Sequence, residues 1–431
     1  MPLPRSLAPL RHRRYAALWS GAFASNIGTW METVGVGILV TTKTGQAGWA
    51  GLGAAAGFLP SGFIGPVGGA LADRVPRRRL LLATTSVQTA LAGLLTALAA
   101  TGSTEPAIVT LIVLGSGCAN ALGFPAYQSM MPDLVPREEL PSAMALGAAQ
   151  WNLGRVIGPA LAGIVIAAGG YEWAFAINTV SFLAVIAAVA PLRLPAPRPH
   201  GDESIIESIR EGIRFARDEP GIRAVIGYLA LNSVLAAPFI ALVPAFALKV
   251  FHDAHDGTSV LVTAQGLGAV LMALMLGGLA DRFGHRHVLL GALAALPVAL
   301  TLYALAPSLA LGAVAIFAVG FLYLGCLSSF MTIAQLRAPT ELRGRVMSAV
   351  MVLLGVLYPL ASIAQGTIAD EIGLRATTAG AAALLALGLV SFRILWPDYD
   401  RHLDGDVAPT EPTARATPAD TVPAPSGGGS A

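Results

Sequence analysis

Two ionisable side chains stand alone inside long apolar stretches, and they are the first candidates for chemistry. Glu32 lies about 17 residues, roughly 25 Å of helix, into an apolar stretch that begins near residue 15. A charge inside a membrane costs at least roughly 2.5–3.5 kcal/mol, so such a residue should face a cavity, a partner or a proton. Because burial favours the neutral form of a carboxyl group, Glu32 could bind and release a proton or attract a cationic ligand. The alternative is a structural hydrogen bond to a polar neighbour.

The second lone charge, Arg155, lies about 13 residues into another apolar stretch. A guanidinium keeps its proton at every physiological pH, so Arg155 cannot itself carry protons. It could pair with Glu32, hold backbone carbonyls of a bent helix, or respond electrostatically to protonation of Glu32. A purely structural role is equally open.

The composition identifies the elements that must position these groups. Of 431 residues, 55% are hydrophobic and only 12% are charged, with a mean hydropathy of +0.68. An average soluble domain is about 25% charged, so the chain cannot cover a water-facing surface of two or three domains. The 48 glycines follow no collagen period, and Cys118 and Cys326 both lie in apolar stretches, where they read as buried side chains. The composition therefore predicts a polytopic membrane protein.

Twelve stretches have the length of about 20 apolar residues that a helix needs to cross a bilayer. They lie near residues 15–40, 49–72, 79–100, 107–130, 142–168, 173–192, 222–248, 258–280, 287–305, 309–334, 346–368 and 374–396. The short alternating runs of a β-barrel are absent from the sequence. We therefore expect an all-α protein with twelve transmembrane helices.

The basic residues predict its orientation, because cytoplasmic loops retain Lys and Arg. If the spans are as given, 23 of the 27 basic residues fall on one side, and only Lys43, Lys249 and Arg375 fall on the other. Both termini should then be cytoplasmic in a bacterial inner membrane, with no cleaved signal peptide. The net charge of +2 gives no reason to expect nucleic acid as a partner. The basic loops should contact anionic membrane lipid, and we expect a monomer.

An internal repeat divides the chain into halves. Residues 69–74 (GALADR) and 277–282 (GGLADR) are 208 positions apart, and the same offset relates Gly117-Cys118 to Gly325-Cys326. Parallel repeats of this kind occur in secondary transporters. The expected organisation is a cytoplasmic N-terminus (1–14), a six-helix bundle (15–192), a linker with an amphipathic helix (193–221), a second bundle (222–396) and a disordered tail (397–431).

The two repeated loops resemble the signature loop of the major facilitator superfamily. Segments 26–34 (NIGTWMETV), 152–163 (NLGRVIGPALAG) and 342–348 (LRGRVMS) resemble its branch of enterobactin exporters and macrolide-efflux proteins, also called transmembrane secretion effectors. The resemblance implies two bundles that rock about a central site, driven by proton entry. It also implies gating roles, through contacts with the opposite half, for Gly69, Asp73, Arg74, Arg77, Arg78, Gly277, Asp281 and Arg282. The usual glycine after the Asp-Arg pair is Pro76 in the first copy, whereas Gly284 is present in the second.

A glycine and proline motif in the fifth stretch bears on the direction of transport. Gly154, Gly158, Pro159 and Gly163 combine close-packing glycines with a helix-bending proline. In the superfamily a Gly-Pro motif at this place is associated with antiporters, although the usual Gly-Gly ending is Ala162-Gly163 here.

The resemblance further implies that stretches 1, 4, 7 and 10 line the cavity. These and their neighbours offer aromatic and amide side chains, which suit a bulky amphipathic ligand. The candidates are Asn26, Trp30, Asn120, Phe124, Tyr127, Gln128, Asn232, Phe239, Tyr323 and Phe330.

The leading hypothesis is a proton-coupled antiporter that exports a bulky drug, siderophore or secondary metabolite, with no cofactor beyond the proton motive force. The alternative is a proton-coupled importer of a nutrient or metabolite. An enzyme is not expected, because the chain has no Walker loop, no His-Glu-x-x-His and no Gly-x-Ser-x-Gly. His252 and His255, with Asp253 and Asp256, could suggest a metal but are better explained as a solvated loop, so no metal site is expected.

Overall fold

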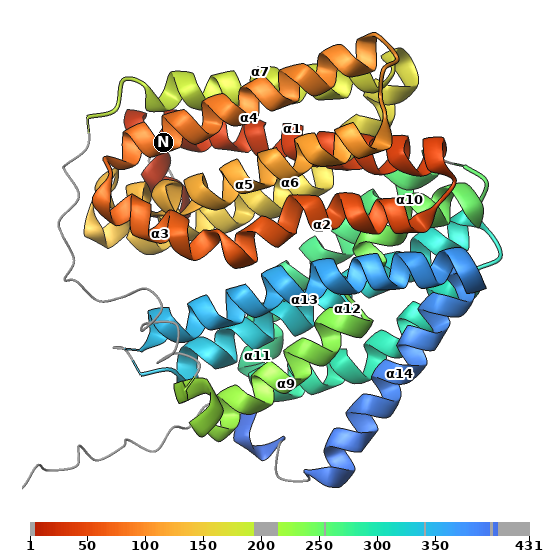
Figure 1. The fold of residues 1–431 in the computed structure, drawn as a ribbon. Helices are drawn as coiled ribbons and strands as arrows, with labels where there is room; N and C mark the ends of the chain where they lie inside the picture. Colours follow the sequence, from red (N-terminus) through yellow and green to blue (C-terminus); the bar gives the residue numbers. More distant parts are fainter. Residues whose placement is uncertain (1–4, 194–213, 254–255, 340–341, 397–399, 404–431) are drawn as a thin grey trace, which may run out of the picture.

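The computed structural model describes residues 5–193, 214–253, 256–339, 342–396 and 400–403, and every regular element among them is a helix (Figure 1). The first half contains α1 (Arg13–Thr44), α2 (Ala47–Phe63), α3 (Gly65–Arg74), α4 (Arg77–Ala100), α5 (Pro106–Met130), α6 (Leu140–Gly169) and α7 (Tyr171–Val189). The second contains α9 (Pro220–Leu235), α10 (Phe239–Lys249), α11 (Asp256–Leu305), α12 (Leu309–Arg337), α13 (Arg343–Ile372) and α14 (Leu374–Leu395). Short 3-10 helices are η1 (Arg5–Arg11), η2 (Met131–Asp133), η3 (Arg137–Glu139) and η4 (Arg401–Leu403).

All twelve apolar stretches coincide with these helices; the sixth ends three residues and the twelfth one residue past its helix. The second stretch is covered by α2 and α3, which meet at a bend of 49°, and the seventh by α9 and α10. By length and composition alone, nine helices of the described chain could cross a membrane, or ten if the bent pair counts as one span. The all-α membrane fold is thus confirmed, while the number twelve is not established by this criterion.

One glycine explains why two predicted spans appear as a single helix. The 50-residue α11 contains Gly284 with φ 79° and ψ 149°, which is outside the helical region. A residue with a side chain rarely adopts this positive φ, and a glycine does so without strain. Gly284 therefore separates the eighth and ninth stretches at the place where the repeated loop ends.

The helices form two bundles that lie side by side (Figure 1). Helices α1–α7 make one and α9–α14 the other, and they meet where α2 packs on α13 and α6 packs on α11. The predicted amphipathic helix of the linker (204–220) lies mostly outside the described residues. The predicted disordered tail lies almost entirely outside them. The two-bundle arrangement places the faces of α2, α6, α11 and α13 at the contact between halves.

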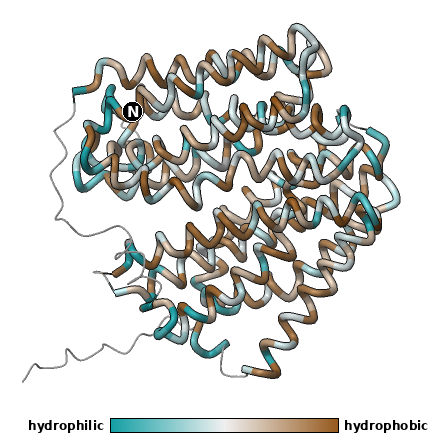
Figure 2. Tube along the Cα trace, in the orientation of Figure 1, coloured by the Kyte–Doolittle hydropathy of each residue, from teal (hydrophilic) through white to brown (hydrophobic). Residues whose placement is uncertain are grey.

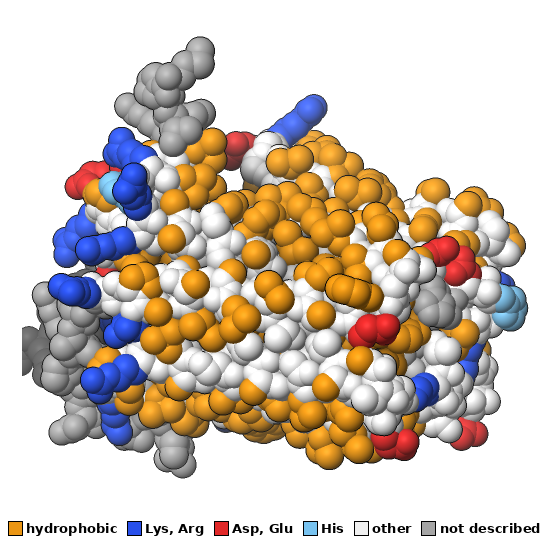
Figure 3. Space-filling model, turned by 90° about the horizontal axis from the view of Figure 1, so that it is seen from above, with side chains coloured by type: hydrophobic (Ala, Val, Ile, Leu, Met, Phe, Trp, Pro, Cys, Tyr) orange, Lys and Arg blue, Asp and Glu red, His pale blue; other side chains and the backbone are white. Residues whose placement is uncertain are grey.

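Apolar side chains cover the middle of the molecule and charged ones lie near its ends (Figures 2 and 3). Leu274 and Ile394 are 78% and 71% exposed, as expected for side chains that face lipid. One end carries the arginine-rich α3–α4, α5–α6 and α12–α13 connections, and we call it the basic end. The other carries the α1–α2 and α13–α14 connections, with Asp370 and Glu371, and we call it the acidic end.

Candidate functional site

A large cavity of about 2070 Å³ lies between the first bundle and α13. Its basic end is lined by Asp73 and Arg74 at the end of α3 and by Arg345 at the start of α13. Glu32 of α1 lines its deeper part, whereas Asp370 and the first residues of α2 at the acidic end do not line it. The cavity therefore extends inward from the basic end.

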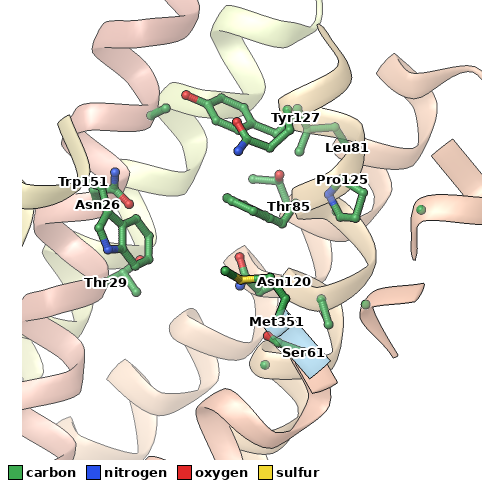
Figure 4. Close-up of a pocket in the computed structure, with 18 of the residues that line it drawn as sticks. Asn26, Thr29, Ser61, Leu81, Thr85, Asn120, Pro125, Tyr127, Trp151 and Met351 are labelled. Atoms are coloured by element: carbon green, nitrogen blue, oxygen red, sulfur yellow. The ribbon is translucent and has the colours of Figure 1, made fainter. Parts of the chain in front are cut away.

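Polar and aromatic side chains face one another across this space (Figure 4). Asn26, Thr29 and Trp151 lie on one side, Asn120, Thr85 and Tyr127 lie on the other, and Met351 and Ser61 lie beyond them. The predicted site residues that line the cavity are Asn26, Glu32, Gly69, Asp73, Arg74, Asn120, Phe124, Tyr127 and Gln128. A bulky ligand with both apolar and hydrogen-bonding groups fits such a lining.

Glu32 is held by a neighbour that the sequence analysis did not single out. Its Oε2 accepts a hydrogen bond of 2.6 Å from Nδ2 of Asn178 on α7, and Glu32 is only 9% exposed. Ser181 Oγ donates to the backbone carbonyl of Asn178 at 2.7 Å and also lies 3.1 Å from Asn178 Oδ1, so it contacts the oxygen side of the amide while the nitrogen side meets the carboxylate. Asn178 is a lone amide inside the sixth apolar stretch, and that isolation is the signal that could have identified it.

A glycine allows α1 to approach α7 at this point. A Cβ on Gly28 would lie 2.7 Å from Asn178 Oδ1 and 2.6 Å from Ser181 Oγ, so a larger residue would displace both. Gly28 precedes Glu32 by one helical turn, on the same face of α1. The close approach is what brings Glu32 within reach of Asn178.

Arg155 does not pair with Glu32 in this structure. Its Cζ lies 5.7 Å from the ring centroid of Trp30, and that ring meets the ring of Trp151 edge-on at 6.0 Å. Among the described residues no carboxylate contacts Arg155, and it does not line the cavity, so it belongs to an aromatic cluster behind the wall formed by Trp151.

The predicted glycines of α6 are points of close helix contact. A Cβ on Gly158 would lie 2.5 Å from Trp30 Cβ, and one on Gly154 would lie 2.9 Å from Asn26 Cβ. A Cβ on Gly163 would lie 2.5 Å from Ser259 Cβ on α11, across the two halves. Helix α6 continues through Pro159 without interruption, so the motif brings helices together rather than breaking one.

The expected symmetric lining by the second half is not what the structure has. Asn232, Phe239, Tyr323 and Phe330 are buried in the core of the second half, and neither they nor Trp30 line the cavity. The reason is that α13, rather than α9 or α12, forms the wall of the cavity on this side. Both amide atoms of Asn232 lack a hydrogen-bond partner within the described part of the chain.

The predicted gating residues make their hydrogen bonds within their own half. Arg77 donates to the carbonyl of Ser129 at 2.8 Å and to Asp133 at 2.9 Å, and Arg78 donates to the carbonyl of Ala190 at 3.0 Å. In the second copy, the guanidinium of Arg282 lies 5.2 Å from the ring centroid of Phe283, while a Cβ on Gly277 would meet open space. Among the described residues, no hydrogen bond or ion pair joins these gating residues to the opposite half, and Asp73 and Arg74 line the cavity at the basic end.

Two helical bundles around a membrane-embedded cavity, with one buried carboxyl group in its wall, define a secondary transporter. The chain belongs to the transmembrane secretion effector family, whose model matches residues 5–417. It is therefore a multi-pass membrane transporter of a small molecule and not an enzyme, and its bacterial relatives imply the inner membrane.

Curated relatives of the chain are efflux proteins. The multidrug efflux pump Tap of Mycolicibacterium fortuitum is 30% identical over 89% of this chain and 95% of its own length. Macrolide efflux protein A of Streptococcus pyogenes is 24% identical over 84% of this chain and 90% of its own length. The enterobactin exporter EntS of Citrobacter koseri is 30% identical over 65% of this chain and 67% of its own length. These relatives, together with the family, identify the chain as an exporter.

Solved structures confirm the fold. A D-xylose-proton symporter superposes with a TM-score of 0.70 at 13% identity, covering 92% of this chain and all of the other. A bacterial homologue of the human lysosomal transporter Spinster, in an inward-facing and unoccupied conformation, superposes with a TM-score of 0.67 at 14% identity. The match covers 92% of this chain and 97% of the other.

Proposed function

We propose that this protein exports bulky amphipathic small molecules in exchange for protons, by alternating access, with Glu32 as the group that proton and substrate use in turn. The observation that carries the proposal is the placement of Glu32: a carboxyl group in the wall of the cavity, bonded to a neutral amide and paired with no described cation. A carboxyl group in such surroundings can exist in both protonation states, as a carrier requires.

The cycle follows from competition at Glu32. With the cavity open at the basic end, which we assign to the cytoplasm, Glu32 gives up its proton and the substrate binds beside the carboxylate. After the halves rock, a proton arriving from the acidic end neutralises Glu32 and weakens its hold on the substrate, which leaves. Each cycle then moves protons inward and substrate outward with no other cofactor.

The lining indicates the substrate class. Trp151, Phe124 and Tyr127 offer aromatic faces, while Met144 and Met351 offer flexible apolar surface. Methionine adapts to ligands of different shape, which suits a pump with several substrates. Asn26, Asn120 and Gln128 add hydrogen bonds, and the carboxylate favours a cationic centre. We therefore place lipophilic cations and macrolides ahead of sugars or simple ions.

Everted membrane vesicles test the direction and the coupling together. A proton gradient that is acidic inside should drive ethidium into vesicles that contain the protein, and collapse of the gradient should release it. Accumulation that requires the opposite gradient would make the protein an importer and would contradict the proposal. Vesicles from cells without the protein provide the baseline.

A further inference from the structure

At the acidic end, the Asp370 carboxylate ties the two halves together. Its Oδ1 accepts a hydrogen bond from the backbone N–H of Ala47 at 2.7 Å, and its Oδ2 accepts one from Gly48 at 2.8 Å. Lys249 Nζ, at the end of α10, lies 2.8 Å from the same Oδ1. One side chain in the last turn of α13 thus joins α2 of the first half to α10 and α13 of the second.

The bonded N–H groups are the unpaired donors that begin helix α2. The first four N–H groups of a helix have no partner within it, and the side chain of the preceding residue often accepts a hydrogen bond from one of them. The preceding residue of α2, Gln46, makes no such bond. Asp370 therefore supplies from the opposite half the cap that α2 lacks, and its negative charge suits a helix N-terminus.

A seam of glycines makes this contact possible. A Cβ on Gly366 of α13 would lie 2.9 Å from the Cα of Gly48, and one on Gly355 would lie 2.8 Å from the Cα of Gly62. A Cβ on Gly51 would clash with the carbonyl of Ser362. The backbones of α2 and α13 touch at these glycines, so a movement of one half against the other would separate Asp370 from Ala47.

The opposite end of the same helix pair repeats the pattern with the roles exchanged. Helix α13 begins at Arg343 after Leu342, whose side chain makes no cap bond, and Asp73 lies in the last turn of α3, which continues α2. Here, however, Asp73 and the first turns of α13 both line the cavity, and Asp73 makes no hydrogen bond among the described residues. Helix α13 is therefore in contact with the start of α2 at the acidic end, whereas the cavity separates it from the end of α3 at the basic end.

We propose that Asp370 is the latch that holds the acidic end closed. When the halves rock, Asp370 would leave the N-terminus of α2 and the acidic end would open, while Asp73 at the basic end has the gating role that the family resemblance already implies. The latch needs neither a particular substrate nor a proton at Glu32, so it can hold or fail independently of the proposed function.

Electron-spin distance measurements on the full-length chain in proteoliposomes test the latch. The labels replace Ser103, in the exposed turn before α5, and Ala310, exposed at the start of α12, in a background where Cys118 and Cys326 are serine. These positions lie on opposite halves at the acidic end. In the parent chain the distances should be short, because that end is closed.

Replacement of the latch should lengthen those distances. Asp370→Asn removes the charge that Ala47, Gly48 and Lys249 share, and the ratio of open to closed acidic ends should rise by about tenfold or more. Glu371→Gln is the matched control, because Glu371 is adjacent and exposed and should leave the distances unchanged. An unchanged distribution in Asp370→Asn would overturn the proposal.

A second variant keeps the test decisive if Asp370→Asn does not fold. Gln46→Asp gives α2 a cap of its own and places a second carboxylate next to Asp370, so it should also open the acidic end. Lys249→Gln removes the ion pair and leaves both backbone hydrogen bonds, so its effect should be smaller than that of Gln46→Asp. Distances that stay short in Gln46→Asp would refute the latch without any substitution of Asp370.

Discussion

Asn178 on α7 donates a hydrogen bond of 2.6 Å to Glu32 on α1, although 146 positions separate the two residues in the chain. Ser181, one turn further along α7, donates to the backbone carbonyl of Asn178 at 2.7 Å and lies 3.1 Å from Asn178 Oδ1. Glu32 is therefore held in a fixed position in the cavity wall. A carboxyl group that must bind a proton in one state and a substrate in the other needs this kind of positioning.

Loss of the Asn178 amide should impair coupling more than loss of the Ser181 hydroxyl. Hydrogen bonds to charged groups contribute roughly 1.5–3 kcal/mol, so Asn178→Ala should lower proton-driven transport about tenfold or more. Ser181→Ala leaves the bond to Glu32 in place and should cost less. Initial rates of ethidium accumulation, normalised to the amount of protein in the membrane, measure both. Equal rates in Asn178→Ala and the parent would exclude a positioning role for Asn178.

The Gly158 contact with α1 should be essential for packing. A Cβ there would lie 2.5 Å from Trp30 Cβ and 2.9 Å from the carbonyl oxygen of Ile27, so Gly158→Ala must push α1 and α6 apart. Overpacking of this kind costs about 1–3 kcal/mol, and thermal unfolding in detergent should show a lower Tm. Gly291→Ala in α11 is the control, because its Cβ meets open space and alanine favours helix. A Tm that falls equally in both variants would contradict the packing argument.

The ion pair between Glu219 and Arg337 predicts a pH-dependent contribution to stability. Burial disfavours the Glu219 carboxylate, but hydrogen bonds from Arg337 at 2.6 Å and from the N–H of Ile222 at 2.5 Å outweigh it and hold the pKa of Glu219 below its ordinary value. A depressed pKa means that the folded protein is stabilised by the ionised form. The contribution is therefore complete above the ordinary glutamate pKa of about 4.3 and is lost as the pH falls through the lowered value.

The comparison of parent and Glu219→Gln measures this contribution. At neutral pH the variant should unfold at a lower temperature, because it loses an interaction worth roughly 1.5–3 kcal/mol. The difference in Tm between the parent and Glu219→Gln should shrink as the pH falls below the ordinary glutamate pKa of about 4.3. Glu138→Gln, at an exposed position, should show no difference at either pH. A gap between parent and Glu219→Gln that widens in acid would contradict the sign of the shift.

The assignment of the basic end to the cytoplasm can be tested by labelling from one side. In whole cells a membrane-impermeant maleimide should react with a cysteine at Ser103, at the acidic end, and not with one at Glu138, at the basic end. The reverse pattern would invert the proposed topology and with it the direction of the cycle. The expectation follows from retention of Lys and Arg on the cytoplasmic side.

The fold could be predicted well because membrane helices are specified by local composition. The apolar stretches coincide with helices of the structure, although their number is not established as twelve, and the Gly284 break falls between the eighth and ninth stretches. Glu32 could be singled out because it is a lone charge in an apolar stretch; the structure places it in the cavity wall, and its role in transport stays a prediction. The contacts of Asn178 with Glu32 and of Asp370 with Gly48 were not predicted. Nothing local in Asn178 or Asp370 indicates which partner lies 146 or 322 positions away.

The lining of the second half could not be predicted for a different reason. Asn232, Phe239 and Phe330 have the residue types of a binding site, but in this conformation they are buried behind α13. Which face of a helix meets the cavity depends on how the halves are rotated, and composition does not encode that angle. Composition also does not reveal that Arg155 lies against Trp30 of α1 rather than in the cavity lining.

The central claim is that Glu32 couples substrate movement to protons, and Glu32→Gln tests it most directly. In everted vesicles the account predicts that the variant no longer accumulates ethidium under an imposed proton gradient. Exchange of labelled for unlabelled ethidium without a gradient should persist only at higher ethidium concentrations, because glutamine resembles the protonated carboxyl group, which holds the substrate weakly. Gradient-driven accumulation at the parental level in Glu32→Gln would contradict the account.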